Sequence, residues 1–168
     1  MEALNKYFTE SEIRQLQNHK DTYNKALYVT NKVFKDTYDK GGNPYMEHLY
    51  SVSDSFDDDD LKVVGLLHDI IEDKEFTKDD LLFLGFTSDQ VEAVSIVTKR
   101  EGEKYSDFID RIIDSNNDIA IQVKYADMIN NMDLSRMKNN SAEEKEYVKN
   151  KYKNEYKKLV KRMERIQW

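Results

Sequence analysis

The sequence predicts an all-α protein, because residues that break secondary structure are rare and apolar residues recur with a helical period. Only one proline and five glycines occur in 168 residues, and the alternating apolar and polar runs typical of strands are absent. The chain has no cysteine, which excludes disulfides and thiolate metal sites and leaves histidine and carboxylate as the strong metal ligands. We expect about eight or nine helices joined by short turns.

The N-terminal part of the chain contains two expected helices with recognisable starts. The segment TESE at 9–12 has the pattern of a capping box, in which Thr9 caps the helix and Glu12 reaches back to it. A second helix is expected from about Asp21, with apolar residues at helical spacing and the two glycines at 41–42 as its stop.

Two further helices are expected before residue 74. Pro44 suits the first turn of the helix PYMEHLYSVSDSF. The acidic run 57–60 precedes LKVVGLLHDIIED, and we interpret it as a cap, not a cation site, because carboxylates bind the free N–H groups at a helix start and oppose its positive dipole end.

The second half of the chain continues the same pattern. TKDD at 77–80 and TSDQ at 87–90 are plausible helix starts, and amphipathic segments follow at 104–113 and 118–137. A long final helix is expected over about 141–167. Its apolar stripe, which can cover the domain's own core or a neighbouring subunit in a homo-oligomer, consists of Tyr147, Val148, Tyr152, Tyr156, Leu159, Val160, Met163 and Ile166.

Size and charge limit the classes of function. A chain of 168 residues can bury one core without staples, so we expect residues 1–168 to form a single domain. The formal net charge of -7 argues against a stable nucleic-acid partner and favours a small-molecule ligand. The first ten residues lack the pattern of a secretory signal, and no apolar run approaches the roughly 20 residues needed to cross a bilayer. We therefore expect a cytoplasmic protein without a membrane partner.

Ionisable residues in the apolar segment LKVVGLLHDIIED are the most unusual feature. At a spacing of four residues, His68 shares a helix face with Glu72, and Asp69 shares one with Asp73. Burial of such groups is costly unless they are paired or bound to a metal. These four residues therefore indicate a compensating cation.

Two other segments place polar residues among apolar ones. Asp127 and Asn131 are four apart in KYADMINNMD, and His48 lies within NPYMEHLYSV. Taken alone, each has an ordinary structural interpretation, since His48 can donate to a backbone carbonyl in the core and Asp127 can pair with Lys124. Three distant segments that offer nitrogen and oxygen ligands together favour a metal site, whereas His19 lies among polar residues and is expected at the surface.

The order of His48, His68–Asp69 and Asp127 resembles the HD superfamily of metal-dependent phosphohydrolases. Four longer strings, KGGNPYMEHLYSV, GLLHDIIEDKEFT, VSIVTKR and VKYADMINNMD, are similar in order and approximate spacing to the hydrolase domain of RelA/SpoT-type alarmone enzymes and to small stand-alone alarmone hydrolases. The similarity runs from about residue 22 to 137. It implies an HD-domain helical bundle that acts as a (p)ppGpp 3′-pyrophosphohydrolase on a nucleotide substrate.

The resemblance also implies roles for individual residues. One divalent ion, typically Mn²⁺ in this family, would be bound by His48, His68, Asp69 and Asp127. The ligand types are equally compatible with Fe, Co, Ni or Zn. Glu72 and Asp73 match the family's acid pair, which orients and deprotonates the attacking water, and the alternative is that they are surface acids at a helix end. Activation of water by a metal would then supply the nucleophile.

Substrate contacts follow from the same resemblance. Asn131 matches an asparagine that contacts the substrate ribose, and Lys40 occupies the place of a basic residue near the nucleotide. Lys99 and Arg100 offer further positive charge, although for all three basic residues a solvated surface position is the alternative.

Three positions depart from the alarmone-hydrolase pattern. Asp39 stands where the family usually has an arginine that packs on the base, and a carboxylate reproduces neither its charge nor its stacking. Phe34 stands in place of a histidine, and Leu134 in place of a threonine at the nucleotide pocket. Other nucleotides therefore remain open as substrates, among them an adenine alarmone, a deoxynucleotide or NADPH, as do a non-catalytic nucleotide-sensing module and a metal-free helical bundle.

Overall fold

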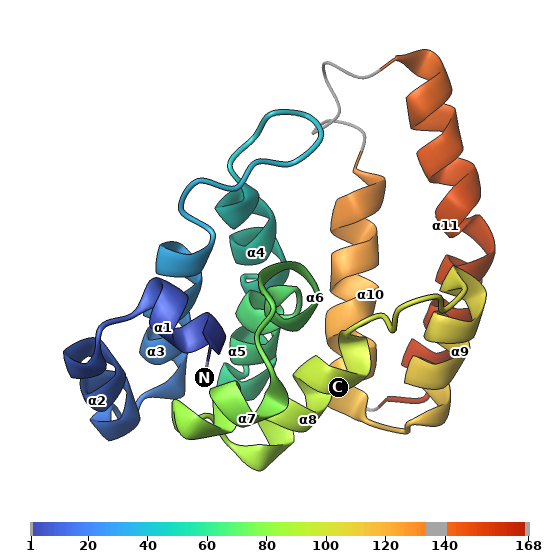
Figure 1. Ribbon diagram of the computed structural model, residues 1–168. Helices are drawn as coiled ribbons and strands as arrows, with labels where there is room; N and C mark the ends of the chain where they lie inside the picture. Colours follow the sequence, from blue (N-terminus) through green and yellow to red (C-terminus); the bar gives the residue numbers. More distant parts are fainter. Residues whose placement is uncertain (1, 134–140, 167–168) are drawn as a thin grey trace.

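The structure, a computed structural model, describes residues 2–133 and 141–166 as a bundle of helices (Figure 1). Within these residues eleven helices and no strand occur, which confirms the predicted all-α class. The first six are α1 (Glu2–Tyr7), α2 (Glu10–Asn18), α3 (Thr22–Val33), α4 (Tyr45–Ser53), α5 (Asp59–Leu67) and α6 (Ile70–Lys74). The other five are α7 (Lys78–Phe83), α8 (Ser88–Val97), α9 (Tyr105–Asp114), α10 (Asp118–Met132) and α11 (Ala142–Met163).

The helix starts follow the expected capping pattern. Capping boxes, in which the N-cap side chain and the third helical residue bind each other's backbone N–H groups, begin α2, α7, α8 and α11 at Thr9, Thr77, Thr87 and Ser141. The acidic run before α5 also acts as a cap, because the Asp58 carboxylate accepts a hydrogen bond from the backbone N–H of Leu61 at 3.0 Å.

The described residues contain two helices that the sequence did not predict separately, α1, which precedes Thr9, and α6, and one expected helix, α3, is shorter than predicted. Helix α3 ends at Val33, well before the glycines at 41–42, and an isolated bridge between Tyr38 and Pro44 closes the following loop. The apolar segment before residue 74 is interrupted at His68 and Asp69, so that α5 and α6 are separate helices.

Helix α5 lies at the centre of the main core. Its Val63, Val64, Leu66 and Leu67 are fully buried, and α3, α4, α8 and α10 all pack against it. The contact with α4 is close, because a Cβ atom added to Gly65 would lie 3.0 Å from the Cα of Ser53. This packing places the C-terminal end of α5 beside α4 and α10.

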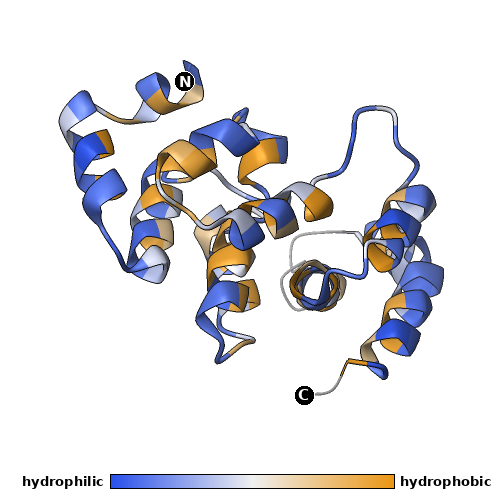
Figure 2. Ribbon diagram, turned by 90° about the horizontal axis from the view of Figure 1, so that it is seen from below, coloured by the Kyte–Doolittle hydropathy of each residue, from blue (hydrophilic) through white to orange (hydrophobic). Residues whose placement is uncertain are grey.

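A second, smaller core lies between α9, α10 and α11. Leu159, Met163 and Ile166 at the end of the chain are buried against residues such as Ile109 of α9, and Figure 2 shows hydrophobic residues on the inward sides of these helices. The apolar stripe of the last helix therefore covers the protein's own core, except near its start, where Tyr147 is 66% exposed. In the described part of the chain, no helix is long and apolar enough to cross a membrane.

Candidate metal centre

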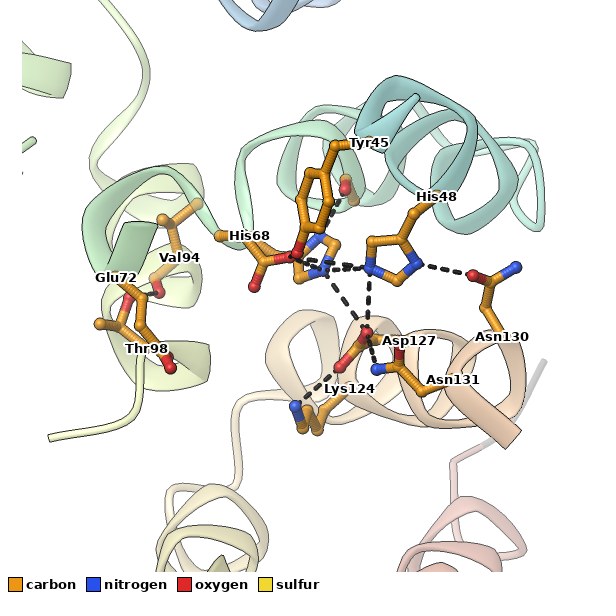
Figure 3. Close-up of polar contacts among 12 residues, drawn as sticks. Tyr45, His48, His68, Glu72, Val94, Thr98, Lys124, Asp127, Asn130 and Asn131 are labelled. Atoms are coloured by element: carbon orange, nitrogen blue, oxygen red, sulfur yellow. Dashed lines mark hydrogen bonds and ion pairs between the residues drawn. The ribbon is translucent and has the colours of Figure 1, made fainter. Parts of the chain in front are cut away.

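Four elements bring the four predicted metal ligands to one point, and Figure 3 shows His48, His68 and Asp127 among them. His48 comes from α4, His68 and Asp69 from the junction of α5 and α6, and Asp127 from α10. The Nε2 atoms of the two imidazoles are 3.2 Å apart. Asp127 Oδ1 lies 3.2 Å from His48 Nε2 and 3.6 Å from His68 Nε2. Asp69 Oδ2 lies 2.9 Å from His68 Nε2 and 3.6 Å from His48 Nε2.

The interruption between α5 and α6 explains how two adjacent residues reach the same point. Consecutive side chains on a continuous helix point about 100° apart around its axis. Asp69 instead has φ -102° and ψ -1°, away from α-helical values, while its carbonyl oxygen still accepts from the backbone N–H of Asp73 at 2.9 Å. The local change of backbone direction lets the side chains of His68 and Asp69 converge.

Hydrogen bonds behind the two imidazoles fix their orientation. His48 Nδ1 donates to Asn130 Oδ1 at 2.6 Å, and the amide of Asn130 donates in turn to Ser51 Oγ at 2.7 Å. His68 Nδ1 donates to the carbonyl oxygen of Gly65 at 2.7 Å. Both Nε2 atoms are thereby directed into the cluster, in the tautomer that a metal ligand requires.

Hydrogen bonds from neighbouring side chains also orient the two carboxylates. Tyr45 donates its phenol proton to Asp69 Oδ2 at 2.6 Å. Lys124 donates to Asp127 Oδ2 at 2.7 Å, and Asn131 donates to Asp127 Oδ1 at 2.7 Å. The pairing of Asp127 with Lys124, which the sequence left as an alternative to metal binding, thus occupies one oxygen while the other faces the imidazoles.

Electrostatics within the cluster favour bound positive charge. Burial lowers the pKa of the His68 imidazole, but the carboxylates of Asp69 and Asp127 outweigh it and raise that pKa well above its ordinary value. Burial would raise the pKa of Asp127, yet Lys124 and both imidazoles hold it well below the ordinary range. The carboxylates therefore remain charged and attract protons to the imidazoles, or a cation in their place.

These donors fit a divalent metal ion. His48, His68 and Asp69 offer ligand atoms within 4.8 Å of one another, a group that stands out among the described histidines and acids. Two imidazole nitrogens with carboxylate oxygens suit Mn²⁺, Fe²⁺ or Zn²⁺ better than a purely oxygen-seeking ion such as Ca²⁺.

Comparison with known proteins agrees with this geometry. The sequence model of the HD domain family matches residues 42–168 of this chain, a range that includes all four converging side chains. The chain belongs to the HD domain family. This result confirms the predicted superfamily and its class of enzyme, the metal-dependent phosphohydrolases.

Solved structures include one with the same fold. It is the structure of a metazoan orthologue of SpoT that hydrolyses ppGpp, with a TM-score of 0.65, 20% sequence identity and 86% of each chain covered. None of the curated proteins matches this HD protein.

The two acids of the predicted catalytic pair, Glu72 and Asp73, have different surroundings. The Glu72 carboxylate accepts a hydrogen bond from the backbone N–H of Lys99 at 2.9 Å and lies beside Thr98, away from the imidazoles (Figure 3). Asp73 is closer to the cluster in electrostatic terms, because burial, followed by the charges of Asp69 and Glu72, raises its pKa. The Glu72 carboxylate is therefore bonded to the backbone that follows α8, and the charge of Asp69 acts on Asp73.

A cleft of about 500 Å³ opens beside His48. It lies between the loop that follows α3, the end of α10 and the first half of α11, and both Lys40 and Asn131 line it. The other two predicted substrate contacts are elsewhere: Arg100 lines a separate cleft beside α9, and Lys99 lines neither of the two.

One cation of this cleft was missed by sequence reasoning. Lys151 on α11 lines the cleft, and its Nζ lies 5.4 Å from the ring centre of Tyr105 and 5.1 Å from that of Tyr152. It has no carboxylate partner within the described ranges. Nothing in the sequence separates it from the other lysines of a lysine-rich helix, so only the packing of α11 could reveal it.

Two of the three positions that depart from the alarmone-hydrolase pattern, Phe34 and Asp39, lie in the described residues, and their contacts explain the residues found there. Phe34 is buried and stacks on Tyr45 at 5.3 Å between ring centres, so it supports the tyrosine that binds Asp69. Asp39 Oδ1 accepts from the backbone N–H groups of Gly41 and Asn43, at 2.8 Å and 2.9 Å. Its carboxylate therefore stabilises its own loop. Leu134 lies outside the described residues.

Proposed function

We propose that this HD protein is a nucleotide pyrophosphohydrolase that removes the 3′-pyrophosphate of (p)ppGpp or of a closely related nucleotide. In this proposal one Mn²⁺ ion is bound by His48, His68, Asp69 and Asp127. The observation that carries the proposal is the convergence of these side chains from four elements beside a cleft large enough for a nucleotide.

The chemistry is divided between the ion and the chain. A bound divalent ion would polarise a phosphate oxygen and lower the pKa of a water molecule from about 15.7 towards neutrality. We assign the general base to Asp73, because the Glu72 carboxylate is bonded to the backbone of Lys99 whereas the charge of Asp69 acts on Asp73. Glu72 would act from further away, by holding the backbone that follows α8 through its bond to Lys99.

The charges around the cleft support a substrate with several phosphate groups. Lys40, in the loop after α3, and Lys151, on α11, both line the cleft. Burial lowers the pKa of Lys151, and the positive charges of Lys40, Lys124 and Lys99 lower it further. Lys151 thus lies in a region of positive charge, and a bound polyphosphate would stabilise its charged form.

A second candidate is hydrolysis of a different nucleotide by the same metal chemistry. It is favoured by Asp39, whose carboxylate binds its own loop where alarmone hydrolases usually carry a base-packing arginine. An adenine alarmone, a deoxynucleoside triphosphate and NADPH are the alternatives to test.

A substrate panel tests the proposal. The purified protein with Mn²⁺ is incubated with ppGpp, an adenine alarmone, deoxynucleoside triphosphates and NADPH, and released phosphate and pyrophosphate are measured. We expect pyrophosphate release from ppGpp and loss of activity by several orders of magnitude in Asp69→Ala, with Asn150→Ala as a surface control. Full activity of Asp69→Ala would contradict the metal site, and turnover of only a non-guanine nucleotide would favour the second candidate.

A further inference from the structure

Two tyrosines at the cleft are exposed to an unusual degree. Tyr38 is 62% exposed and Tyr147 is 66% exposed, more than any other large hydrophobic side chain in the described residues. Both line the cleft beside His48. Neither phenol forms a hydrogen bond within the described part of the chain, so both rings are available to a ligand.

The tyrosines approach the cleft from different elements. Tyr38 lies in the loop after α3, where its backbone pairs with Pro44 and Asp39 fixes the adjoining turn. Tyr147 lies near the start of α11. In Figure 1 this loop and the first half of α11 flank the C-terminal end of α10.

Each tyrosine is close in sequence to a cation of the cleft. Tyr38 is two residues from Lys40, and Tyr147 is four residues before Lys151 on the same helix face. Both lysines line the cleft with the tyrosines. A ligand that fits this arrangement has phosphate groups for the lysines and a flat apolar group for the tyrosines.

We propose that Tyr38 and Tyr147 form a stacking subsite for the nucleobase of the ligand. A base offers π faces that stack on aromatic side chains with little dependence on its identity, and each such contact typically contributes on the order of tenfold or more in affinity. Stacking by tyrosine takes the place of the missing arginine, because the Asp39 carboxylate is bound within its loop. The inference rests on one part of the proposed function, namely that the ligand is a nucleotide.

Equilibrium binding tests the subsite without any need for turnover. The probes are GDP, ADP and inorganic pyrophosphate, titrated into the Mn²⁺-loaded protein by calorimetry. We expect Tyr38→Leu and Tyr147→Leu each to weaken GDP and ADP about tenfold and to leave pyrophosphate unchanged, while the phenylalanine variants bind like the wild type. Tyr28→Leu is the matched control, because Tyr28 is 46% exposed and does not line the cleft.

Three results would overturn the inference. The first is unchanged nucleotide affinity in both leucine variants. The second is an equal loss of pyrophosphate affinity in these variants, which would indicate general damage to the cleft. The third is a wild-type protein that binds neither nucleotide more tightly than pyrophosphate. Absence of hydrolysis would overturn the proposed function alone, because a selective loss of nucleotide binding would still establish the stacking subsite.

Discussion

Asn130 is uncharged and does not belong to the predicted ligand set, yet its amide oxygen accepts the Nδ1 proton of His48 at 2.6 Å. Partners of this kind fix the tautomer and orientation of a metal-binding imidazole. We predict that Asn130→Ala lowers Mn²⁺ affinity by about 10- to 100-fold, measured by metal titration. The exposed Asn150, also on a helix, provides the control Asn150→Ala, which should bind Mn²⁺ normally. An unchanged affinity in Asn130→Ala would show that His48 is oriented by other contacts.

The sequence reveals charged residues in apolar segments better than it reveals the residues that support them through hydrogen bonds or line the adjacent cleft. His48, His68, Asp69 and Asp127 attracted attention because ionisable residues rarely occur within such apolar segments, and the resemblance to the HD superfamily then grouped them as ligands. Asn130 and Lys151 are ordinary on a helix surface, and only three-dimensional packing gives them a place beside the site. A residue is thus predictable when its chemistry conflicts with its local sequence.

At the scale of elements, helix starts were predictable and the break between α5 and α6 was not. Caps depend on residues three apart in sequence, so Thr77 and Thr87 could be identified directly. The segment LKVVGLLHDIIED contains residues that tolerate a continuous helix throughout. Its interruption at His68 and Asp69 therefore depends on tertiary contacts, such as the close approach of α4 and α5.

Gly65 permits this close approach, because the space for a side chain is occupied by the backbone of Ser53. We predict that Gly65→Ala destabilises the fold by about 1–3 kcal/mol, since backbone atoms of α4 must move to admit the added methyl group. Urea unfolding measures the change, and Lys149→Ala on the exposed face of α11 should stay within about 0.5 kcal/mol of the wild type. Stability equal to that of the wild type would show that α4 and α5 separate without cost.

The link between α8 and α9 depends on an ion pair with a defined pH response. The Arg111 guanidinium donates to the carbonyl oxygens of Ile96 and Thr98 and to both oxygens of Glu103. Its hydrogen bonds lower the pKa of Glu103 from 4.5 to about 2. Because the folded pKa is depressed, the stabilisation is complete above pH 4.5 and is lost as the pH falls towards 2.

We therefore predict that Glu103→Gln destabilises the protein most above pH 4.5, and that the difference from the wild type shrinks as the pH falls towards 2. Urea midpoints measured between pH 6 and pH 3 check this. A difference that stays constant across that range would mean that the charge of Glu103 does not contribute to the link.

At the scale of the whole molecule, the structure shows that the second half of the last helix covers the protein's own core. Leu159 and Met163 pack into a second core with α9 and α10, which places the start of α11 along the cleft and adds Lys151 to it. Sequence periodicity identifies an apolar stripe but not its partner, because the partner is set by contacts far apart along the chain.

The candidate metal centre links the two cores, since His48 lies on α4 and His68 at the end of α5, two helices of the main core, and Asp127 lies on α10, which contributes residues to both cores. An ion that binds the folded chain alone stabilises it by about 2.7 kcal/mol at 100 times its dissociation constant. For a domain of this size we predict a rise in Tm of roughly 5–10 °C, measured by calorimetry of the metal-free protein with and without Mn²⁺. The rise should be absent in Asp127→Ala, whereas an equal rise in that variant would place the bound ion elsewhere.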